Sequence, residues 1–312
     1  MPPLDLRPLA LGELFDRAFV LYRRHFWLFV GVTAVPGLFA LVTTLTQIAL
    51  QEKVVPAPNA AAPDSAATLE NLAGVFWLFG GMMVALIVYA VVYMIALGAT
   101  TYAVSEIYVG RAVTIRDVFG RMRGRIGGLI VLLLLLGLRL GGVAFAGLLA
   151  LGFGGALGSF IHPVVGGLIA VGLGVATAGA CVFMALRYGV AVPAFVLEGL
   201  PPGESIRRSI ALTRGRLGRV FLLVLCATLI TYAAVVLFQG PFFGGALFAG
   251  IESRLGFWLN VAGAVSGTIG STLTAPFLII GLVLIYYDAR IREEGFDLEL
   301  TLAALDREPS GA

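Results

Sequence analysis

Long, uninterrupted apolar runs dominate the pattern of hydrophobic and polar positions along the chain. A helix needs about 20 apolar residues to cross a hydrocarbon core of about 30 Å. Six segments reach that length, at residues 26–50, 74–105, 126–153, 165–192, 217–240 and 257–287. The run LIVLLLLLGL (129–138) is apolar throughout, whereas barrel strands alternate between apolar and polar residues. The pattern therefore predicts an all-α, polytopic membrane helix bundle with six transmembrane helices.

Three basic segments of similar sequence precede the odd-numbered spans. TIRDVFGRMRGRIGGLI (114–130) aligns without a gap with SIRRSIALTRGRLGRVF (205–221), and LFDRAFVLYRRHFWLFV (14–30) is a more diverged copy. Each copy has four stripe residues, spaced by four, three and four, which places them on one face of a helix. These are Phe15, Phe19, Tyr22 and Phe26; Ile115, Phe119, Met122 and Ile126; and Ile206, Ile210, Thr213 and Leu217. The stripes predict interfacial amphipathic helices, and Thr114 and Ser205 are positioned to cap two of them.

The copies divide the chain into similar units, because each basic helix leads into a pair of spans. We expect a single integral membrane domain over 1–312, with three pseudo-repeats at about 9–110, 111–199 and 200–300 and a flexible C-terminal tail at 301–312. The connections at 153–164 and 240–256 are predicted as glycine-rich loops, and residues 51–71 as a linker without a fold of its own. Glycine-rich runs in spans three and four favour close helix packing.

An acid followed by a glycine ends each even-numbered span. The pairs are Glu106 and Gly110, Glu198 and Gly199, and Asp288 and Gly295. Glycine supplies the left-handed residue that ends a helix, whereas a carboxylate there opposes the helix dipole and favours a nearby cation. We therefore expect inter-repeat ion pairs between these acids and arginines of the basic helices, with exposed acids at the water interface as the alternative.

Basic residues are distributed unequally between the two sides of the predicted bundle. Eighteen of the 21 arginines and lysines lie before the first span, after the last, or in and beside the two connections that hold basic segments. Lys53 and Arg254 fall on the other side, and Arg139 lies within span three. Because positive residues concentrate in cytoplasmic loops, both termini are predicted in the cytoplasm. This topology also explains the net charge of +3 without a nucleic-acid partner.

The basic helices are candidates for binding membrane lipids. Arginines at the cytoplasmic interface attract anionic headgroups, each contributing about 1 kcal/mol. The alternative is that they only fix the topology and cover the inner face of the bundle. A possible membrane or cytoplasmic protein partner also stays open, whereas no nucleic-acid-reading fold is visible. The candidate lipid or anion contacts are Arg17, Arg116, Arg139, Arg207, Arg208, Arg214 and Arg216.

Arg139 is the most costly of these residues, because a central arginine costs about 2.5–3.5 kcal/mol on insertion scales. It should face a cavity, a polar partner or another subunit, with snorkelling toward the interface as the alternative. Hydroxyl and amide side chains that could face it cluster in spans five and six. They are Thr228, Thr231, Tyr232, Asn260, Ser266, Thr268, Ser271, Thr272 and Thr274.

Three segments of the chain resemble signature regions of a known family. They are LRPLALGELFDRAFVLYRRHFWLF (6–29), AVPAFVLEGLPPGESIRRSIALTRGRLGRVF (191–221) and IYYDARIREEGFDLEL (285–300). They are similar to the six-span, largely uncharacterised glycerophosphoryl diester phosphodiesterase membrane-domain family. The resemblance covers essentially the whole chain and implies a multi-pass protein of the bacterial cytoplasmic (inner) membrane. The phosphodiesterase barrel that accompanies this region in some members is not expected here.

Catalytic residues are sparse in this sequence. Hydrolysis of a glycerophosphodiester needs histidines for acid–base work and carboxylates for a divalent metal, but the chain has only His25 and His162, predicted on opposite sides of the membrane. We therefore expect no cofactor, no metal and no enzymatic activity. The favoured function is a non-enzymatic membrane protein that binds lipid headgroups or scaffolds a membrane partner at its cytoplasmic face. The alternative is a transporter or lipid-translocating protein with a site near Arg139.

Overall fold

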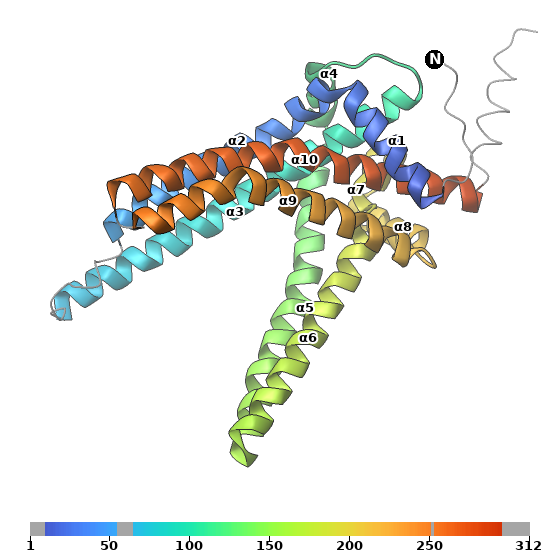
Figure 1. The fold of residues 1–312 in the computed structure, drawn as a ribbon. Coiled ribbons are helices and arrows are strands. Elements are labelled where there is room, and N and C mark those ends of the chain that lie inside the picture. Colours follow the sequence, from blue (N-terminus) through green and yellow to red (C-terminus); the bar gives the residue numbers. More distant parts are fainter. Residues whose placement is uncertain (1–9, 55–64, 251–252, 295–312) are drawn as a thin grey trace, which may run out of the picture.

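The computed structural model describes residues 10–54, 65–250 and 253–294. All of its long elements are α-helices (Figure 1). The long helices are α2 (Phe26–Val54), α3 (Ser65–Tyr108), α5 (Ile126–Ile161), α6 (Pro163–Tyr188), α9 (Leu217–Ala249) and α10 (Arg254–Glu294). The short helices are α1 (Leu11–Arg24), α4 (Ile115–Arg123), α7 (Ala191–Glu198) and α8 (Pro202–Leu212). The expected tail at 301–312 and Gly295 lie outside the described residues.

Six segments of this helical structure are long and apolar enough to cross a membrane. They are Phe26–Leu50, Phe79–Tyr108, Ile126–Ile161, Pro163–Glu198, Leu217–Ala249 and Arg254–Arg292. The all-α fold and the six spans are therefore confirmed. Two expected loops are wrong in large part, because α5 continues to Ile161 and α9 continues to Ala249. Apolar runs rich in glycine stay helical there, since the helix satisfies backbone groups that lipid cannot.

The expected linker at 51–71 is also shorter than the sequence indicated. α2 reaches Val54 and α3 begins at Ser65, so helices cover both ends of that range. Residues 55–64 lie outside the described part of the chain. The alanine-rich stretch after residue 64 is helical, consistent with the high helix propensity of alanine.

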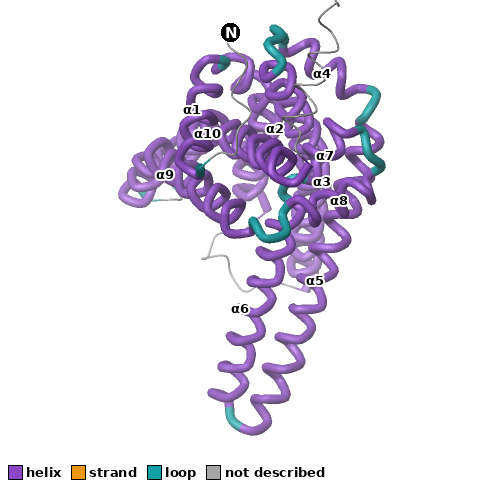
Figure 2. Tube along the Cα trace, turned by 90° about the vertical axis from the view of Figure 1, so that its right-hand side faces the viewer, coloured by secondary structure: helices purple, strands orange, loops and turns teal. Residues whose placement is uncertain are grey.

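The long helices form two arms that diverge from a shared end (Figure 1). One arm is a bundle in which α9 packs along α10, α10 on α2, and α2 on α3. The other arm is the α5–α6 hairpin, which extends alone in the view of Figure 2. The short helices α1, α4, α7 and α8 gather at the shared end, which we call the junction (Figures 1 and 2).

Glycines hold the α5–α6 hairpin together by letting the two backbones approach closely. A Cβ atom added at Gly166 would lie 2.6 Å from the Gly155 carbonyl oxygen and 2.7 Å from the Ser159 nitrogen. At Gly158 it would lie 2.9 Å from the Gly166 Cα atom. Small residues at such positions are the usual means of helix association in membranes. The expected role of the glycine runs in close packing is therefore observed along this arm.

Pro276 shapes the other arm by removing one backbone donor from α10. The carbonyl of Thr272, four residues earlier, thereby loses its usual helical partner. The Thr33 hydroxyl of α2 donates to that carbonyl oxygen at 3.2 Å, and the Tyr22 hydroxyl of α1 donates to the neighbouring Leu273 oxygen at 2.6 Å. Side chains of α1 and α2 therefore satisfy backbone carbonyls beside the proline of α10.

The basic helices α1, α4 and α8 pack in a cyclic order. α4 lies on α3, α8 lies on α7, and α1 lies on α10. Each basic helix therefore contacts the last helix of the preceding unit, and α1 closes the ring against the final span. Two of these contacts join helices that are adjacent in the chain, whereas the contact of α1 with α10 joins its two ends.

The apolar stripes of the basic helices face protein to a greater extent than the predicted interfacial position would require. Met122, Ile206 and Thr213 are buried in the core, whereas Ile115 and Phe19 are partly exposed. The fully buried matched positions are Ala18, Val118 and Ser209, one residue before the second stripe position. The buried face is thus rotated from the expected one, because each helix packs on a neighbouring span.

One of the two expected helix caps is correct and the other is wrong. Thr114 caps α4, since its hydroxyl accepts from the Asp117 N–H at 3.3 Å. Ser205 instead lies inside α8, where its hydroxyl donates to the Pro201 carbonyl oxygen at 3.0 Å. α8 begins earlier, at Pro202, because proline is preorganised for the first helical position.

Candidate functional site

The junction brings together the acids that end the even-numbered spans. Glu198, at the end of α7, accepts hydrogen bonds from Nε of Arg208 to both carboxylate oxygens at 3.0 Å. The Tyr286 hydroxyl of α10 donates to the same carboxylate at 2.6 Å. Tyr286 is fully buried, and the Glu198 and Arg208 side chains are 16% and 25% exposed. The expected pair is therefore present and joins α7 to α8. Tyr286 adds a contact from α10 to the same carboxylate.

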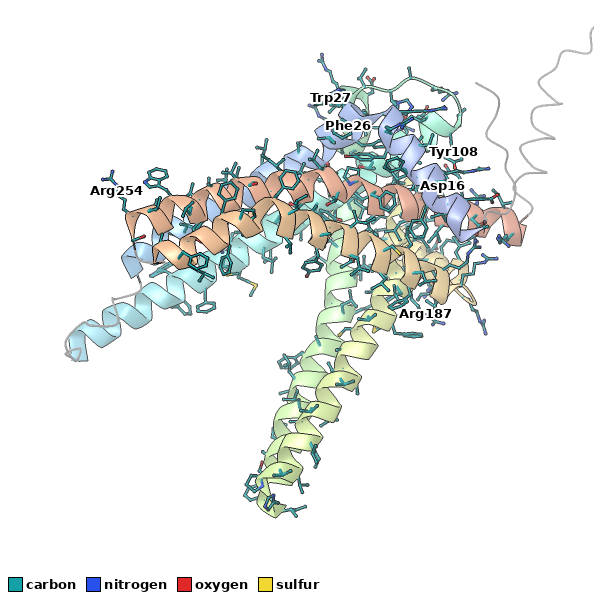
Figure 3. All side chains as sticks on the ribbon, in the orientation of Figure 1. Asp16, Phe26, Trp27, Tyr108, Arg187 and Arg254 are labelled. Atoms are coloured by element: carbon teal, nitrogen blue, oxygen red, sulfur yellow. The ribbon has the colours of Figure 1, made fainter. Side chains whose placement is uncertain are left out.

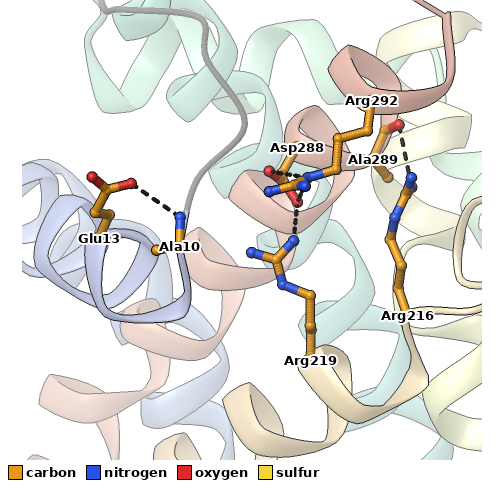
Figure 4. Close-up of polar contacts among 7 residues, drawn as sticks. All are labelled: Ala10, Glu13, Arg216, Arg219, Asp288, Ala289 and Arg292. Carbon is orange, nitrogen blue, oxygen red and sulfur yellow. Dashed lines mark hydrogen bonds and ion pairs between the residues drawn. The ribbon is translucent and has the colours of Figure 1, made fainter.

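Asp288 is the most buried of the three acids, with a side chain that is 3% exposed. Nη1 of Arg219 donates to it at 2.7 Å from the start of α9, and Nε of Arg292 donates at 3.0 Å from the next turn of α10 (Figure 4). Arg219 belongs to the basic segment 205–221, although the structure places it at the start of α9, so the expected pairing is found for this arginine. Arg292 lies on the same helix as Asp288 and was not an expected partner. Two cations satisfy the carboxylate because a single buried charge must be paired.

Glu106 makes the weakest of the three pairs. Nη1 of Arg111 donates to it at 3.3 Å, from the connection between α3 and α4. Arg111 is 70% exposed, so solvent screens the interaction. The glycines that follow the acids behave as expected where they are described: Gly110 and Gly199 have φ of 81° and 68°.

Matching arginines of the second and third copies make matching contacts. Arg125 donates to the Val196 carbonyl oxygen, 71 residues further along the chain. Arg216, its counterpart in the third copy, donates to the Ala289 carbonyl oxygen at 3.3 Å, 73 residues further (Figure 4). Each arginine therefore joins the start of its unit's first span to the end of the second. A cation at a helix C-terminus is favourable because the last carbonyls carry partial negative charge.

A pocket of about 500 Å³ lies between α4 and the end of α3. Its walls carry three cationic side chains, an aromatic ring and one acid, with a glycine between them. The lining residues are Tyr102, Arg116, Asp117, Gly120, Arg121 and Arg123. The guanidinium of Arg121 lies 5.9 Å from the centre of the Tyr102 ring. We call this the α3–α4 pocket.

The acid in the α3–α4 pocket is already engaged. Thr114 donates to Asp117 from its hydroxyl at 2.6 Å and from its backbone N–H at 3.1 Å. The Thr114 hydroxyl, followed by its N–H, lowers the pKa of Asp117, although burial opposes the shift. Asp117 stays ionised but its oxygens serve the helix cap, while Arg116, Arg121 and Arg123 are exposed. The pocket therefore presents a net positive charge.

The seven expected contact arginines separate into distinct groups. Arg208 and Arg216 make the internal contacts described above, and Arg17 interacts with Tyr108 at the end of α3. Arg116, Arg207 and Arg214 are exposed and make no hydrogen bond or ion pair within the described part of the chain. Of these three, Arg116 lines the α3–α4 pocket.

Arg139 lies away from the polar side chains that were expected to face it. It is exposed on α5 and has no bonded partner among the residues that the structure describes. α5 packs mainly on α6, with lesser contacts to α3 and α8. The hydroxyls of spans five and six belong to α9 and α10 in the other arm. Several of them line a cavity of about 360 Å³ between α2, α3, α9 and α10. The expected meeting of Arg139 with these hydroxyls is therefore not observed.

The two sides of the predicted topology correspond to opposite ends of the molecule. Arg254 lies at the far tip of the α9–α10 arm, whereas Asp16 and Tyr108 lie near the junction (Figure 3). His25 ends α1 at the junction, while His162 caps α6 at the tip of the hairpin. Within the described ranges, no group of three or more His, Cys, Asp and Glu side chains is arranged to hold a metal ion.

The α3–α4 pocket was only partly visible in the sequence. The sequence marks Arg116 as a candidate lipid or anion contact but does not single out Tyr102, Arg121 or Arg123. The available signal was an aromatic residue near the end of span two, the level at which tyrosines concentrate at membrane interfaces. Its position beside α4 depends on the packing of α4 on α3, which the sequence pattern does not specify.

Six membrane-length apolar helices, with ion pairs gathered at one end, define the class: the chain is a multi-pass integral membrane protein. No family model, curated protein or solved structure matches it. The resemblance to the glycerophosphoryl diester phosphodiesterase membrane-domain family therefore stays a prediction.

Proposed function

We propose that the protein is a non-enzymatic protein of a bacterial inner membrane that binds anionic lipid headgroups at its cytoplasmic face. The observation that carries this proposal is the α3–α4 pocket, an open space of about 500 Å³ that is lined by three exposed arginines. Arginine is suited to phosphate because its planar guanidinium donates two hydrogen bonds at once. A phosphate-bearing headgroup, held beside the Tyr102 ring, is the ligand that this chemistry favours.

The position of the pocket along the spans supports a lipid ligand. Tyr102 lies six residues before the end of α3 at Tyr108, or about 9 Å along the helix axis. α4 is followed within three residues by Ile126, the start of the next span. The pocket therefore lies at the depth of the headgroups if the junction is cytoplasmic, as the distribution of basic residues predicts. Exposed Arg207 and Arg214 on the same face add general attraction for anionic membranes.

The test compares two variants that remove equal charge. Arg116→Gln with Arg121→Gln alters the pocket, whereas Arg207→Gln with Arg214→Gln alters exposed arginines outside it. Binding of phosphatidylglycerol and phosphatidylcholine to the full chain in detergent is measured by native mass spectrometry. Two lost arginine contacts at about 1 kcal/mol each predict about a 30-fold weaker affinity for phosphatidylglycerol in the pocket variant. The control should change by less than about threefold, since its arginines are further from the ligand.

An equal loss in both variants would show that only the overall positive charge matters, and would overturn the pocket as the site. Equal binding of phosphatidylcholine and phosphatidylglycerol by the unaltered protein would remove the preference for anionic lipids. Because both variants keep the acids of the junction, a general loss of folding is recognised separately by their thermal unfolding.

A further inference from the structure

A second cavity lies inside the bundle arm, at some distance from the junction. It has a volume of about 360 Å³ and is lined by residues of α2, α3, α9 and α10. Most of its lining residues lie about 10–30 Å from the junction ends of these helices, at about 1.5 Å rise per residue. This range is within the hydrocarbon core. We call this space the hydroxyl cavity.

Several polar groups of the hydroxyl cavity have no protein partner. The side-chain hydroxyls of five lining residues make no hydrogen bond within the described part of the chain: Thr228, Thr272, Tyr89, Tyr93 and Tyr232. None of these five side chains is fully buried, so their hydroxyls face the open space of the cavity, and at membrane depth that space offers little water to satisfy them. A ligand that donates and accepts hydrogen bonds can satisfy them there.

The chemistry of the lining restricts the ligand. No charged side chain is among the described residues that line the cavity. An ion in such a site would pay its desolvation cost without a counter-charge, so an uncharged ligand is favoured. The remaining lining is apolar, including Pro36, Ala40, Val235 and Leu278. A volume of about 360 Å³ falls in the range of small-molecule sites, which combine apolar walls with a few polar groups.

The mouth of the cavity opens toward lipid. Tyr232 lines the cavity and is 66% exposed, so the space is not sealed at α9. On the same helix, Leu229 and Val236 are 59% and 67% exposed, as expected for side chains that contact acyl chains. α3 and α9 stand at the two ends of the packed row α3–α2–α10–α9 and make little contact with each other. A ligand can therefore enter sideways from the membrane.

The walls of the cavity are fixed before any ligand binds. Thr33 donates to the Thr272 carbonyl oxygen that Pro276 leaves free, which holds α2 against α10. Gly37 makes room for the Thr272 side chain, because a Cβ atom at Gly37 would lie 2.3 Å from its hydroxyl oxygen. A preorganised site loses less entropy on binding than a flexible one.

We propose that the hydroxyl cavity binds an uncharged glycerolipid of the diacylglycerol type. The ligand's free hydroxyl and ester groups lie among the threonine and tyrosine hydroxyls, and its acyl chains remain in the membrane between α3 and α9. This site is separate from the α3–α4 pocket in position and in ligand charge. The bundle arm thus carries a function of its own, independent of the headgroup binding proposed above.

The experiment measures binding of dioctanoylglycerol to the full chain in detergent by native mass spectrometry. Ala40→Phe fills the cavity, and Thr228→Val with Thr272→Val removes two of its hydroxyls while keeping the side-chain shape. The matched controls are Ala49→Phe and Thr46→Val on α2, both exposed, where Thr46 bonds only to its own helix. Each cavity variant should weaken binding at least about tenfold, and each control by less than about threefold.

Several results would overturn the proposal. These are the absence of saturable dioctanoylglycerol binding, equal weakening by the controls, and equal competition by dioctanoyl phosphatidylglycerol. If Ala40→Phe unfolds the protein, the valine pair still decides the outcome, because it adds no volume. The Arg116→Gln and Arg121→Gln variant should bind dioctanoylglycerol normally, so failure of headgroup binding and failure of this site give different patterns.

Discussion

Replacement of Glu198 by glutamine tests whether the junction ion pair holds the repeats together. The change keeps the shape of the side chain but removes the charge that accepts from Arg208 at 3.0 Å and from Tyr286 at 2.6 Å. Arg208, which is partly buried, then loses its ion pair with Glu198. Removing one partner of a buried pair costs about 3–5 kcal/mol. Because the two side chains are 16% and 25% exposed, we expect a smaller loss, about 2–3 kcal/mol in the free energy of unfolding.

The assay is reversible SDS denaturation in mixed micelles, followed by tryptophan fluorescence. Glu198→Gln, Arg208→Gln and the double variant complete a thermodynamic cycle. The double variant removes both charges of the pair together, so it should be more stable than the two separate losses predict. We expect a coupling energy of at least about 1 kcal/mol, within the range for residues in direct contact.

Glu106→Gln is the matched control for this cycle. Its partner Arg111 is 70% exposed, so the change should cost less than about 1 kcal/mol. Additive losses for Glu198 and Arg208, or an equal cost at Glu106, would refute the conclusion that burial at the junction makes this pair structurally important.

Four further predictions concern other parts of the molecule. Asp288→Asn should cost about 2–4 kcal/mol in SDS denaturation, because two arginines lose a shared, buried anion. Gly166→Leu should separate the α5–α6 hairpin and cost about 1–3 kcal/mol, whereas Gly167→Leu, which meets nothing within 4 Å, should be neutral in the same assay. Burial raises the pKa of the Tyr22 phenol to about 12; the free energy of unfolding should therefore fall as the pH rises from about 10 to 12, less steeply in Tyr22→Phe. The C-terminus is predicted in the cytoplasm. A green fluorescent protein fused there should therefore fluoresce, and an alkaline phosphatase fused there should be inactive.

The sign of the Tyr22 prediction follows from which state holds the proton. In that pH interval the folded protein keeps the phenol protonated while the unfolded chain has lost the proton, so stability falls as the pH rises. An identical pH slope in Tyr22→Phe would contradict this assignment. Active phosphatase at the C-terminus would reverse the predicted topology, and an intact hairpin in Gly166→Leu would contradict the close packing described for α5 and α6.

The spans could be predicted from the sequence because hydropathy is a local property. The pair Glu198–Arg208 could also be anticipated, since its members are ten residues apart and the turn at Gly199 brings them back together. The start of α8 was missed because the proline pair at 201–202 outweighs the capping tendency of Ser205. Local chemistry was therefore informative wherever no competing local signal was present.

Contacts between distant spans could not be predicted in the same way. A helix such as α5 is apolar on every side, so its sequence does not indicate which face meets which neighbour. For this reason the sequence pattern grouped Arg139 with hydroxyls of α9 and α10, although Arg139 lies on α5 in the other arm. The place of Tyr102 in the α3–α4 pocket could not be predicted either, because it depends on how α4 packs on α3. Both outcomes follow from helix packing, which is decided by side-chain shape rather than by hydropathy.

The contacts that Pro276 attracts have a consequence for biosynthesis. Tyr22 and Thr33 bond to backbone groups 251 and 239 residues further along the chain. During synthesis, the first pair of spans is therefore in the membrane long before its partner in the last span has been made. Until α10 inserts, these hydroxyls and the ring of basic helices lack their final contacts. A chain that ends before Thr272 would thus leave the Tyr22 and Thr33 hydroxyls without these backbone partners.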